Sequence, residues 1–145
     1  VQTCALPILI SSIAGKVGAP MRTAYSAAKF GLIGYADSLR TEVSHLGVQV
    51  HVIAPGSIRT DVSRNALTAD GSRRGVTDKA IERGFDPDAA VATMLAAMAA
   101  GEREIIIARG FELEIGELRR TPDALHDKMA ALITAGYAAK MEEAE

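Results

Sequence analysis

Apolar residues follow two different periods along the chain. Three short runs, Ile8 to Ser12, Val48 to Ala54 and Glu104 to Arg109, are rich in branched apolar side chains, which is typical of strands in a covered sheet. Between them, apolar positions recur every three or four residues from about Thr23 to Leu46, and an Ala-rich stretch leads to Gly101, which predicts helices. Strands separated by helices predict right-handed crossovers and a parallel α/β sheet.

Residues typical of helix starts and helix ends lie at the limits of the predicted helices. Gly47 is placed to end the first helix, and Asp86-Pro87-Asp88 supplies an N-cap, a proline at the first helical position and an early acid for the second. Thr121-Pro122-Asp123 repeats the start signal, so residues 111–145 are predicted to form a helical extension. Its apolar stripe favours packing against the protein over a membrane surface. The stripe consists of Leu125, Met129, Leu132, Ile133 and Tyr137.

A polar stretch of about thirty residues, roughly Ser57 to Phe85, follows the second strand. Unstructured connections beyond about 15 residues are usually functional or mobile, so this stretch is predicted to be a partly helical lid. Its acids, Asp61, Asp70 and Asp78, are interpreted as residues that set turns and helix starts.

Composition excludes several classes of function. With 16 basic and 18 acidic residues among 145, the net charge is −2, and no basic cluster exceeds a pair, which argues against a nucleic-acid partner. Cys4 is the single cysteine, which excludes an internal disulfide. The sequence contains no run of about 18 apolar residues, which is the length that would predict a membrane span. His45, His51 and His126 are scattered and predict no metal site, and His51 is interpreted as structural. We therefore expect a soluble, cytoplasmic protein.

The first eight residues, VQTCALPI, contain neither an initiator Met nor a basic signal-peptide region. They resemble the translated end of a widely used sequencing adapter, so residues 1–8 are interpreted as non-native. The expectation is that natural sequence upstream of them is missing.

Tyr25 and Lys29 lie four residues apart in the first predicted helix and therefore share one face. An ammonium group beside a phenol stabilises the phenolate, which makes tyrosine a usable general acid or base. In isolation, the pair is more typical of an aromatic ring packed on a lysine stem than of a catalytic pair.

The neighbouring sequence favours chemistry. Ser12 precedes Tyr25 by 13 residues at the end of the first strand, where its hydroxyl can orient a carbonyl oxygen. The second strand ends at Pro55-Gly56-Ser57-Ile58-Arg59-Thr60, a turn with backbone donors and hydroxyls. Because the carboxyl ends of parallel strands meet at one edge, which is where open α/β sheets bind ligands, these segments are predicted to converge.

These motifs resemble the catalytic part of a short-chain dehydrogenase/reductase. Ile10-Ser11-Ser12, Tyr25-Ser-Ala-Ala-Lys29 and Pro55-Gly56-Ser-Ile58-Arg-Thr60 match that family's pattern in order and spacing, from about residue 8 to residue 110. Within the family, Asn65 to Ser72, followed by Gly75 and Asp78, resembles the branch of dehydrogenase/reductase member 7B.

The resemblance implies catalytic roles for Ser12, Tyr25 and Lys29. Tyr25 would exchange a proton with the substrate oxygen, Ser12 would position that oxygen, and Lys29 would support the tyrosine and bind the nicotinamide ribose. The 13-residue spacing favours Ser12 over its neighbour Ser11. The cofactor would be NAD(P), with NADP favoured, and the substrate a small carbonyl compound or alcohol. The implied cofactor-binding residues are Tyr25, Lys29, Pro55, Gly56, Ile58 and Thr60.

The implied fold is an NAD(P)-binding, Rossmann-like, doubly wound parallel sheet, here truncated to its last three strands within residues 9–110. The family's glycine-rich turn, which places the cofactor pyrophosphate at a helix N-terminus, is absent from these 145 residues. The isolated chain is therefore expected to be inactive. A homo-oligomer through the Tyr25 helix would explain Gly31 and Gly34. The alternatives are a non-enzymatic dimerisation fragment and a degenerate binding protein.

Overall fold

A computed structural model of the chain describes residues 6–118, 131, 135 and 136. The helix start predicted at Thr121 and the apolar stripe from Leu125 to Tyr137 lie outside the described residues. Among the described residues, no helix is both long and apolar enough to cross a membrane.

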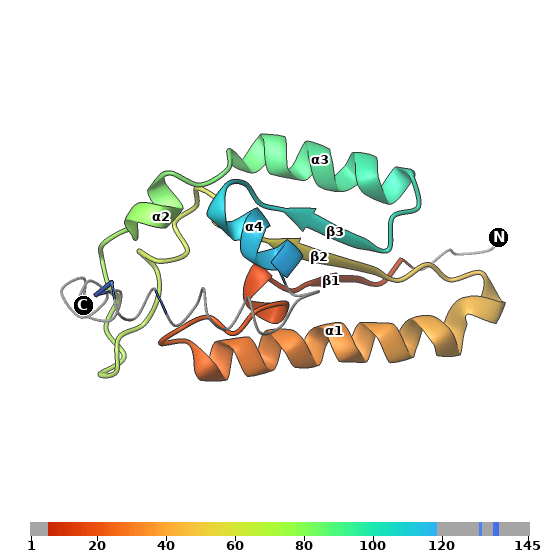
Figure 1. Cartoon of the computed structure of the whole chain (residues 1–145), viewed down its shortest axis with the longest axis horizontal. Coiled ribbons are helices and arrows are strands. Elements are labelled where there is room, and N and C mark those ends of the chain that lie inside the picture. The colour runs from red at the N-terminus through yellow and green to blue at the C-terminus, as the bar shows by residue number, and fades with distance from the viewer. Residues whose placement is uncertain (1–5, 119–130, 132–134, 137–145) are drawn as a thin grey trace.

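Three strands form one parallel sheet in the order β1-β2-β3 (Figure 1). They are β1 (Ile8–Ile10), β2 (His51–Pro55) and β3 (Glu104–Ile107). Ile53 in the middle strand pairs with Ile10 on one side and Ile105 on the other. Because all three strands run in the same direction, their carboxyl ends lie at one edge of the sheet. The segments that directly follow the strands begin at this edge.

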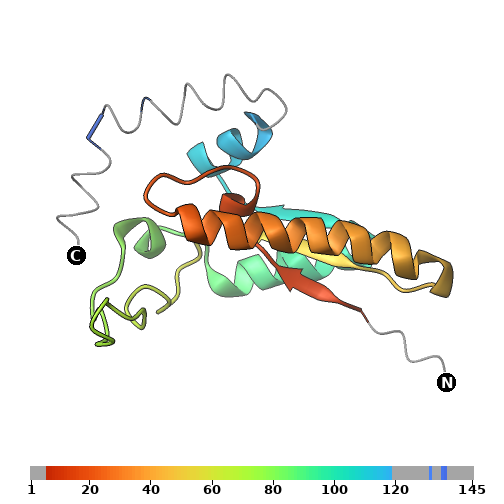
Figure 2. The same cartoon turned by 90° about the horizontal axis from the view of Figure 1, so that it is seen from below.

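Two helices cover opposite faces of the sheet, α1 (Thr23–Val43) on one and α3 (Pro87–Ala99) on the other (Figures 1 and 2). One core cluster joins α3 to the middle and last strands through residues such as Ala90, Ile53 and Ile105. Another joins α1 to the sheet through Ala36 and Val52. This arrangement confirms the predicted α/β class with helices on both faces.

Helix ends follow the capping signals. The Asp86 carboxylate accepts hydrogen bonds from the amides of Asp88 and Ala89 and so starts α3 as predicted. A 3₁₀ turn (Ser44–Leu46) extends α1, and Gly47 ends it with a φ of 73°. This left-handed conformation is accessible to glycine without a steric penalty.

The second strand is shorter than predicted, because it begins at His51 instead of Val48. Its ladder partners begin at Ile8, opposite His51, and at Glu104, opposite Val52. Among the described residues, residues 48–50 therefore have no partner strand on either side, although Val50 is buried against α1. β1 and β3 likewise end earlier than predicted, at Ile10 and Ile107.

Three residues singled out in the sequence have simple environments. His51 is buried, and its Nδ1 lies 2.7 Å from the Glu102 carbonyl oxygen, which confirms its structural role. Apart from the backbone of their own helix, a Cβ atom added at Gly31 or Gly34 would meet no atom of the described residues within 4 Å. Close packing against the described part of the chain therefore does not explain these two helical glycines.

The predicted lid is tied together at its two ends. The amide of Phe85 donates to the Ser57 carbonyl at 2.8 Å, and the amide of Arg59 donates to the Phe85 carbonyl at 2.9 Å. Within the lid, α2 (Lys79–Glu82) starts at Asp78, whose carboxylate accepts from the Ala80 amide. This single turn of helix is the helical part that the sequence predicted.

Asp70 organises the tip of the lid as a turn. Hydrogen bonds from the Thr68 hydroxyl, and then from the amide and hydroxyl of Ser72, lower the pKa of Asp70 from 3.8 to about 2. The carboxylate therefore stays charged in the folded turn at pH values where a free aspartate is protonated. Asp70 and Asp78 both serve local structure, as the sequence predicted.

Candidate active site

The carboxyl edge of the sheet gathers the segments that the sequence singled out. The short 3₁₀ helix η1 (Ile13–Gly15), the start of α1 and the helix α4 (Phe111–Leu118) all lie near this end of the strands, together with the lid (Figure 1). Ile13 of η1 packs with Ile115 of α4 in a small core of its own. This packing fixes η1, and with it the residue that precedes it, against the sheet edge.

Ser12 caps η1. Its backbone is extended, and its Oγ accepts a hydrogen bond from the Ala14 amide at 3.1 Å. The side chain is half-buried, and its hydroxyl proton is donated to no described protein group. The Ala14 amide therefore holds the Ser12 oxygen in place, and the hydroxyl proton can be donated to a ligand oxygen.

The preceding serine has a different environment. Ser11 is buried, and its hydroxyl donates to the backbone carbonyl of Lys29 at 3.0 Å. Gly15 packs against this same junction, since a Cβ added there would run into Ser11 Oγ and lie 2.8 Å from the Lys29 carbonyl oxygen. Ser11 therefore ties β1 to α1, which leaves Ser12 as the member of the pair with an accessible hydroxyl.

Tyr25 and Lys29 are neighbours on the first turns of α1, as their spacing predicted. The ammonium of Lys29 lies 5.6 Å from the centre of the Tyr25 ring and donates to the Ile10 carbonyl at 2.9 Å. Tyr25 is 43% exposed. Lys29 thus links the tyrosine to the end of β1, next to the serines.

The loop between η1 and α1 is held by Ser26. This buried side chain accepts a hydrogen bond from the Ala19 amide at 3.1 Å, while its own amide donates to the Arg22 carbonyl at 2.8 Å. The ion pair between Arg22 and Asp78, at 4.0 Å, joins this start of α1 to the lid. The tyrosine's helix is therefore connected to both the sheet and the lid.

The turn after β2 has most of its backbone donors occupied. The Gly56 amide donates to Ile107, the Ser57 amide to the Glu112 carboxylate and the Arg59 amide to Phe85. Within the described residues, the amides of Ile58, in the middle of the turn, and of Thr60, at its end, donate to no protein group. One open donor therefore remains in the middle of the turn.

Thr60 lies at the end of this turn and is exposed. Its hydroxyl lies 3.5 Å from the Ile58 carbonyl oxygen, at the limit of hydrogen bonding, so it can turn toward a ligand instead. Pro55 is the last residue of β2 and pairs with Ile107. The turn predicted from Pro55 to Thr60 thus begins at the sheet and ends at an exposed hydroxyl.

Glu112 is the site residue that the sequence did not reveal. Its carboxylate accepts from the Ser57 amide at 2.9 and 3.1 Å and from the Ser57 hydroxyl at 2.7 Å. An acid in the first turn of a helix is favourable for the helix dipole alone, so its position in the sequence carries no further signal. The contact joins residues 55 positions apart.

These residues fit one end of a nicotinamide cofactor. An open amide at Ile58 and an exposed hydroxyl at Thr60 match the acceptor and donor of a carboxamide group. The glycine-rich turn that would hold a pyrophosphate is absent from the 145 residues. Among the described residues, Ile58 and Thr60 thus fit the nicotinamide end of such a cofactor.

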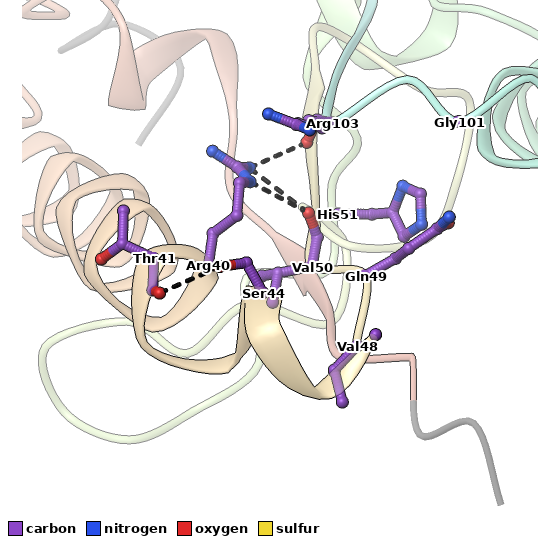
Figure 3. Close-up of a pocket in the computed structure, with 10 residues that line it drawn as sticks. Arg40, Thr41, Ser44, Val48, Gln49, Val50, His51, Gly101 and Arg103 are labelled. Atoms are coloured by element: carbon purple, nitrogen blue, oxygen red, sulfur yellow. Dashed lines mark hydrogen bonds between the residues drawn. The ribbon is translucent and has the colours of Figure 1, made fainter. Parts of the chain in front are cut away.

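A cavity of about 540 Å³ lies at the opposite edge, where the strands begin (Figure 3). Arg40 on its wall donates to the backbone carbonyls of Val50 and Arg103 and to the Asp37 carboxylate. These contacts tie α1 to the starts of β2 and β3. The cavity is thus separate from the serine, tyrosine and lysine, and the arginine on its wall already has protein partners.

Comparisons with known proteins agree with this geometry. Residues 7–71 match the family described as short chain dehydrogenase. A Danio rerio dehydrogenase/reductase SDR family member 7B is 41% identical over 101 residues, which are 70% of this chain and 33% of the relative. A Drosophila melanogaster dehydrogenase/reductase SDR family protein 7-like is 42% identical over 98 residues, covering 68% and 30%. The chain spans about a third of the length of these curated relatives.

Solved structures show the same fold. A short chain dehydrogenase from Burkholderia cenocepacia J2315 in complex with NADP matches with a TM-score of 0.67 and 25% identity, over 86% of this chain and 47% of that one. A short chain dehydrogenase/reductase from Burkholderia phymatum in complex with NAD matches with a TM-score of 0.65 and 16% identity, over 85% and 49%. The chain belongs to the short-chain dehydrogenase/reductase family, in the branch of dehydrogenase/reductase SDR family member 7B.

Proposed function

We propose that this chain carries the catalytic part of an NAD(P)-dependent oxidoreductase that interconverts a carbonyl and a hydroxyl group. The observation that carries the proposal is the Tyr25–Lys29 pair, because Lys29 anchors it to Ile10 at the end of β1, two residues before Ser12. Family membership supports the same reaction class. A general acid, a cation and a hydroxyl at one sheet edge are the groups that carbonyl reduction requires.

When bound, the cofactor supplies the hydride for the substrate carbon, or accepts it in the reverse reaction. Tyr25 donates its phenolic proton to the carbonyl oxygen, so the C=O bond becomes C–OH and the tyrosine becomes a phenolate. The Lys29 ammonium stabilises that phenolate, and the Ser12 hydroxyl donates a hydrogen bond that orients the same oxygen. Oxidation of an alcohol runs these proton transfers backwards.

The cofactor contacts belong to the same proposal. The Ile58 amide would hold the carboxamide oxygen and the Thr60 hydroxyl its amino group, with Pro55 and Gly56 shaping the turn, while Tyr25 and Lys29 would lie against the ribose. NADP is the form that we propose as favoured; the solved structure from B. cenocepacia is in complex with NADP, and the one from B. phymatum is in complex with NAD.

The proposal is tested by expressing the protein from its complete gene and supplying NADPH or NADH with a panel of aldehydes and ketones. We expect loss of reduced-cofactor absorbance that depends on the added carbonyl compound. Cofactor binding without turnover across the panel would contradict an oxidoreductase and support a binding protein. A protein that binds neither cofactor would contradict the proposal altogether.

We also propose that α1 joins a second copy of the chain. Gly31 and Gly34 are exposed, and Tyr35 beside them is 60% exposed, so no described residue of the single chain covers this face. Gly34→Arg should leave the fold intact, since nothing lies within 4 Å of its Cβ position, but should lower self-association in analytical ultracentrifugation. Ala92→Arg, on the exposed side of α3, is the control. An unchanged oligomer in Gly34→Arg would contradict this interface.

A further inference from the structure

We infer that Glu112 positions the turn that binds the nicotinamide carboxamide, an inference that rests on the proposed function. Glu112 lies in the first turn of α4, just after β3, and its carboxylate takes both donors of Ser57. Hydrogen bonds to a charged acceptor are shorter and stronger than those between neutral groups. The middle of the turn is therefore fastened to a helix that belongs to a different part of the chain.

Gly56 makes room for this contact. A Cβ atom added at Gly56 would run into Oε2 of Glu112, lie 2.9 Å from its Cδ and lie 3.3 Å from Cβ of Ala108. Any larger residue at position 56 must therefore displace the carboxylate or the turn. The glycine and the glutamate form one structural unit, with the glycine providing the space that the glutamate fills.

The carbonyl group of Ser57 is held as well as its amide. Its carbonyl accepts from the Phe85 amide at 2.8 Å, and Gly84 packs so closely that an added Cβ would lie 2.5 Å from the same oxygen. Ser57 C=O and Ile58 N–H belong to one planar trans peptide, in which the two groups point in opposite directions. Fixing the carbonyl on Phe85 therefore aims the Ile58 amide away from the lid.

Glu112 thus acts through Ser57 and not on the cofactor itself. By holding the Ser57 amide, it sets the peptide plane before the serine, while Phe85 sets the one after it. Together they keep the Ile58 amide, which is an open donor in the middle of the turn, in one direction. Losing the carboxylate should weaken recognition of the nicotinamide end and leave recognition of the adenosine end unchanged.

The test uses isothermal titration calorimetry, in which the protein expressed from its complete gene is titrated with each of two probes. One is the reduced cofactor that it binds, NADPH or NADH, and the other is the matching 2′-phospho-ADP-ribose or ADP-ribose, which lacks nicotinamide. Glu112→Ala should raise the Kd for the cofactor about tenfold and leave the Kd for the second probe unchanged. Glu117→Ala, on the exposed side of the same helix, should change neither.

A second set of variants keeps the inference testable if Glu112→Ala folds poorly. Gly56→Ala should displace the carboxylate and weaken cofactor binding as Glu112→Ala does, so the double variant should be no weaker than either single one. Additive losses in the double variant would overturn the coupling. Equal losses for both probes would indicate general damage and overturn the positioning role, while the proposed function would stand. A parent protein that binds neither cofactor would remove both.

Discussion

Tyr25→Phe should lower kcat for carbonyl reduction by about 100- to 10,000-fold, which is the contribution that a positioned general acid makes. The phenylalanine cannot supply the proton that the substrate oxygen needs as the hydroxyl forms. Tyr25 is 43% exposed, and its hydroxyl has no hydrogen-bond partner among the described residues, so the substitution leaves no buried group unpaired. The measurement is steady-state turnover of the protein expressed from its complete gene, together with the Kd for the cofactor by titration.

Tyr35→Phe is the matched control, because Tyr35 lies on the same helix and is 60% exposed. It removes the same hydroxyl group ten residues along α1 and should leave kcat unchanged. The Kd for the cofactor should change little in either variant. A Tyr25→Phe protein with parental kcat would remove Tyr25 from the mechanism, whatever its effect on stability.

Gly15→Ala should lower the free energy of unfolding by about 1–3 kcal/mol, the usual penalty for overpacking a tight site. The new Cβ would run into Ser11 Oγ and lie 2.8 Å from the carbonyl oxygen and 2.9 Å from the carbonyl carbon of Lys29. Backbone atoms cannot swing aside as a flexible side chain can, so η1 must move away from α1. Urea unfolding followed by circular dichroism measures the loss.

Gly18→Ala provides the comparison, since a Cβ there meets nothing within 4 Å and the backbone does not require glycine. It should be neutral or slightly stabilising. Gly15→Ala should also lower kcat, because Ser12 caps η1 and Lys29 carries the ammonium beside Tyr25. Equal stability of the two variants would mean that the junction between β1 and α1 tolerates an added methyl group.

The accessibility of the two serines after β1 is a property that the sequence alone does not decide. The spacing to Tyr25 favoured Ser12, but the pattern Ile10-Ser11-Ser12 does not say which hydroxyl is accessible. In the structure, Ser11 is buried on the Lys29 carbonyl 18 residues away, and Ser12 remains half-buried with a free proton. That difference depends on how α1 packs on the sheet, which is a long-range interaction.

Strand limits show the same division. The alternation from Val48 to Ala54 correctly predicts a strand, but β2 begins only where β1 and β3 can pair with it, at His51 and Val52. Helix limits are more predictable than strand limits, because they depend on residues close in sequence. Asp86 accepts hydrogen bonds from amides two and three residues later, and Gly47 ends its helix by adopting a left-handed backbone conformation. Pairing partners come from distant sequence, whereas capping partners do not.

The sequence by itself determined the α/β class, the helix ends and the shared helix face of Tyr25 and Lys29, because periodicity, capping and four-residue spacing act within one or two helical turns. Only the tertiary structure decided that Glu112 holds Ser57, that Gly15 and Gly56 have no room for a side chain, and that the Ile58 amide stays open. Those features depend on backbone segments that meet only when the chain has folded, so no local pattern of residues encodes them.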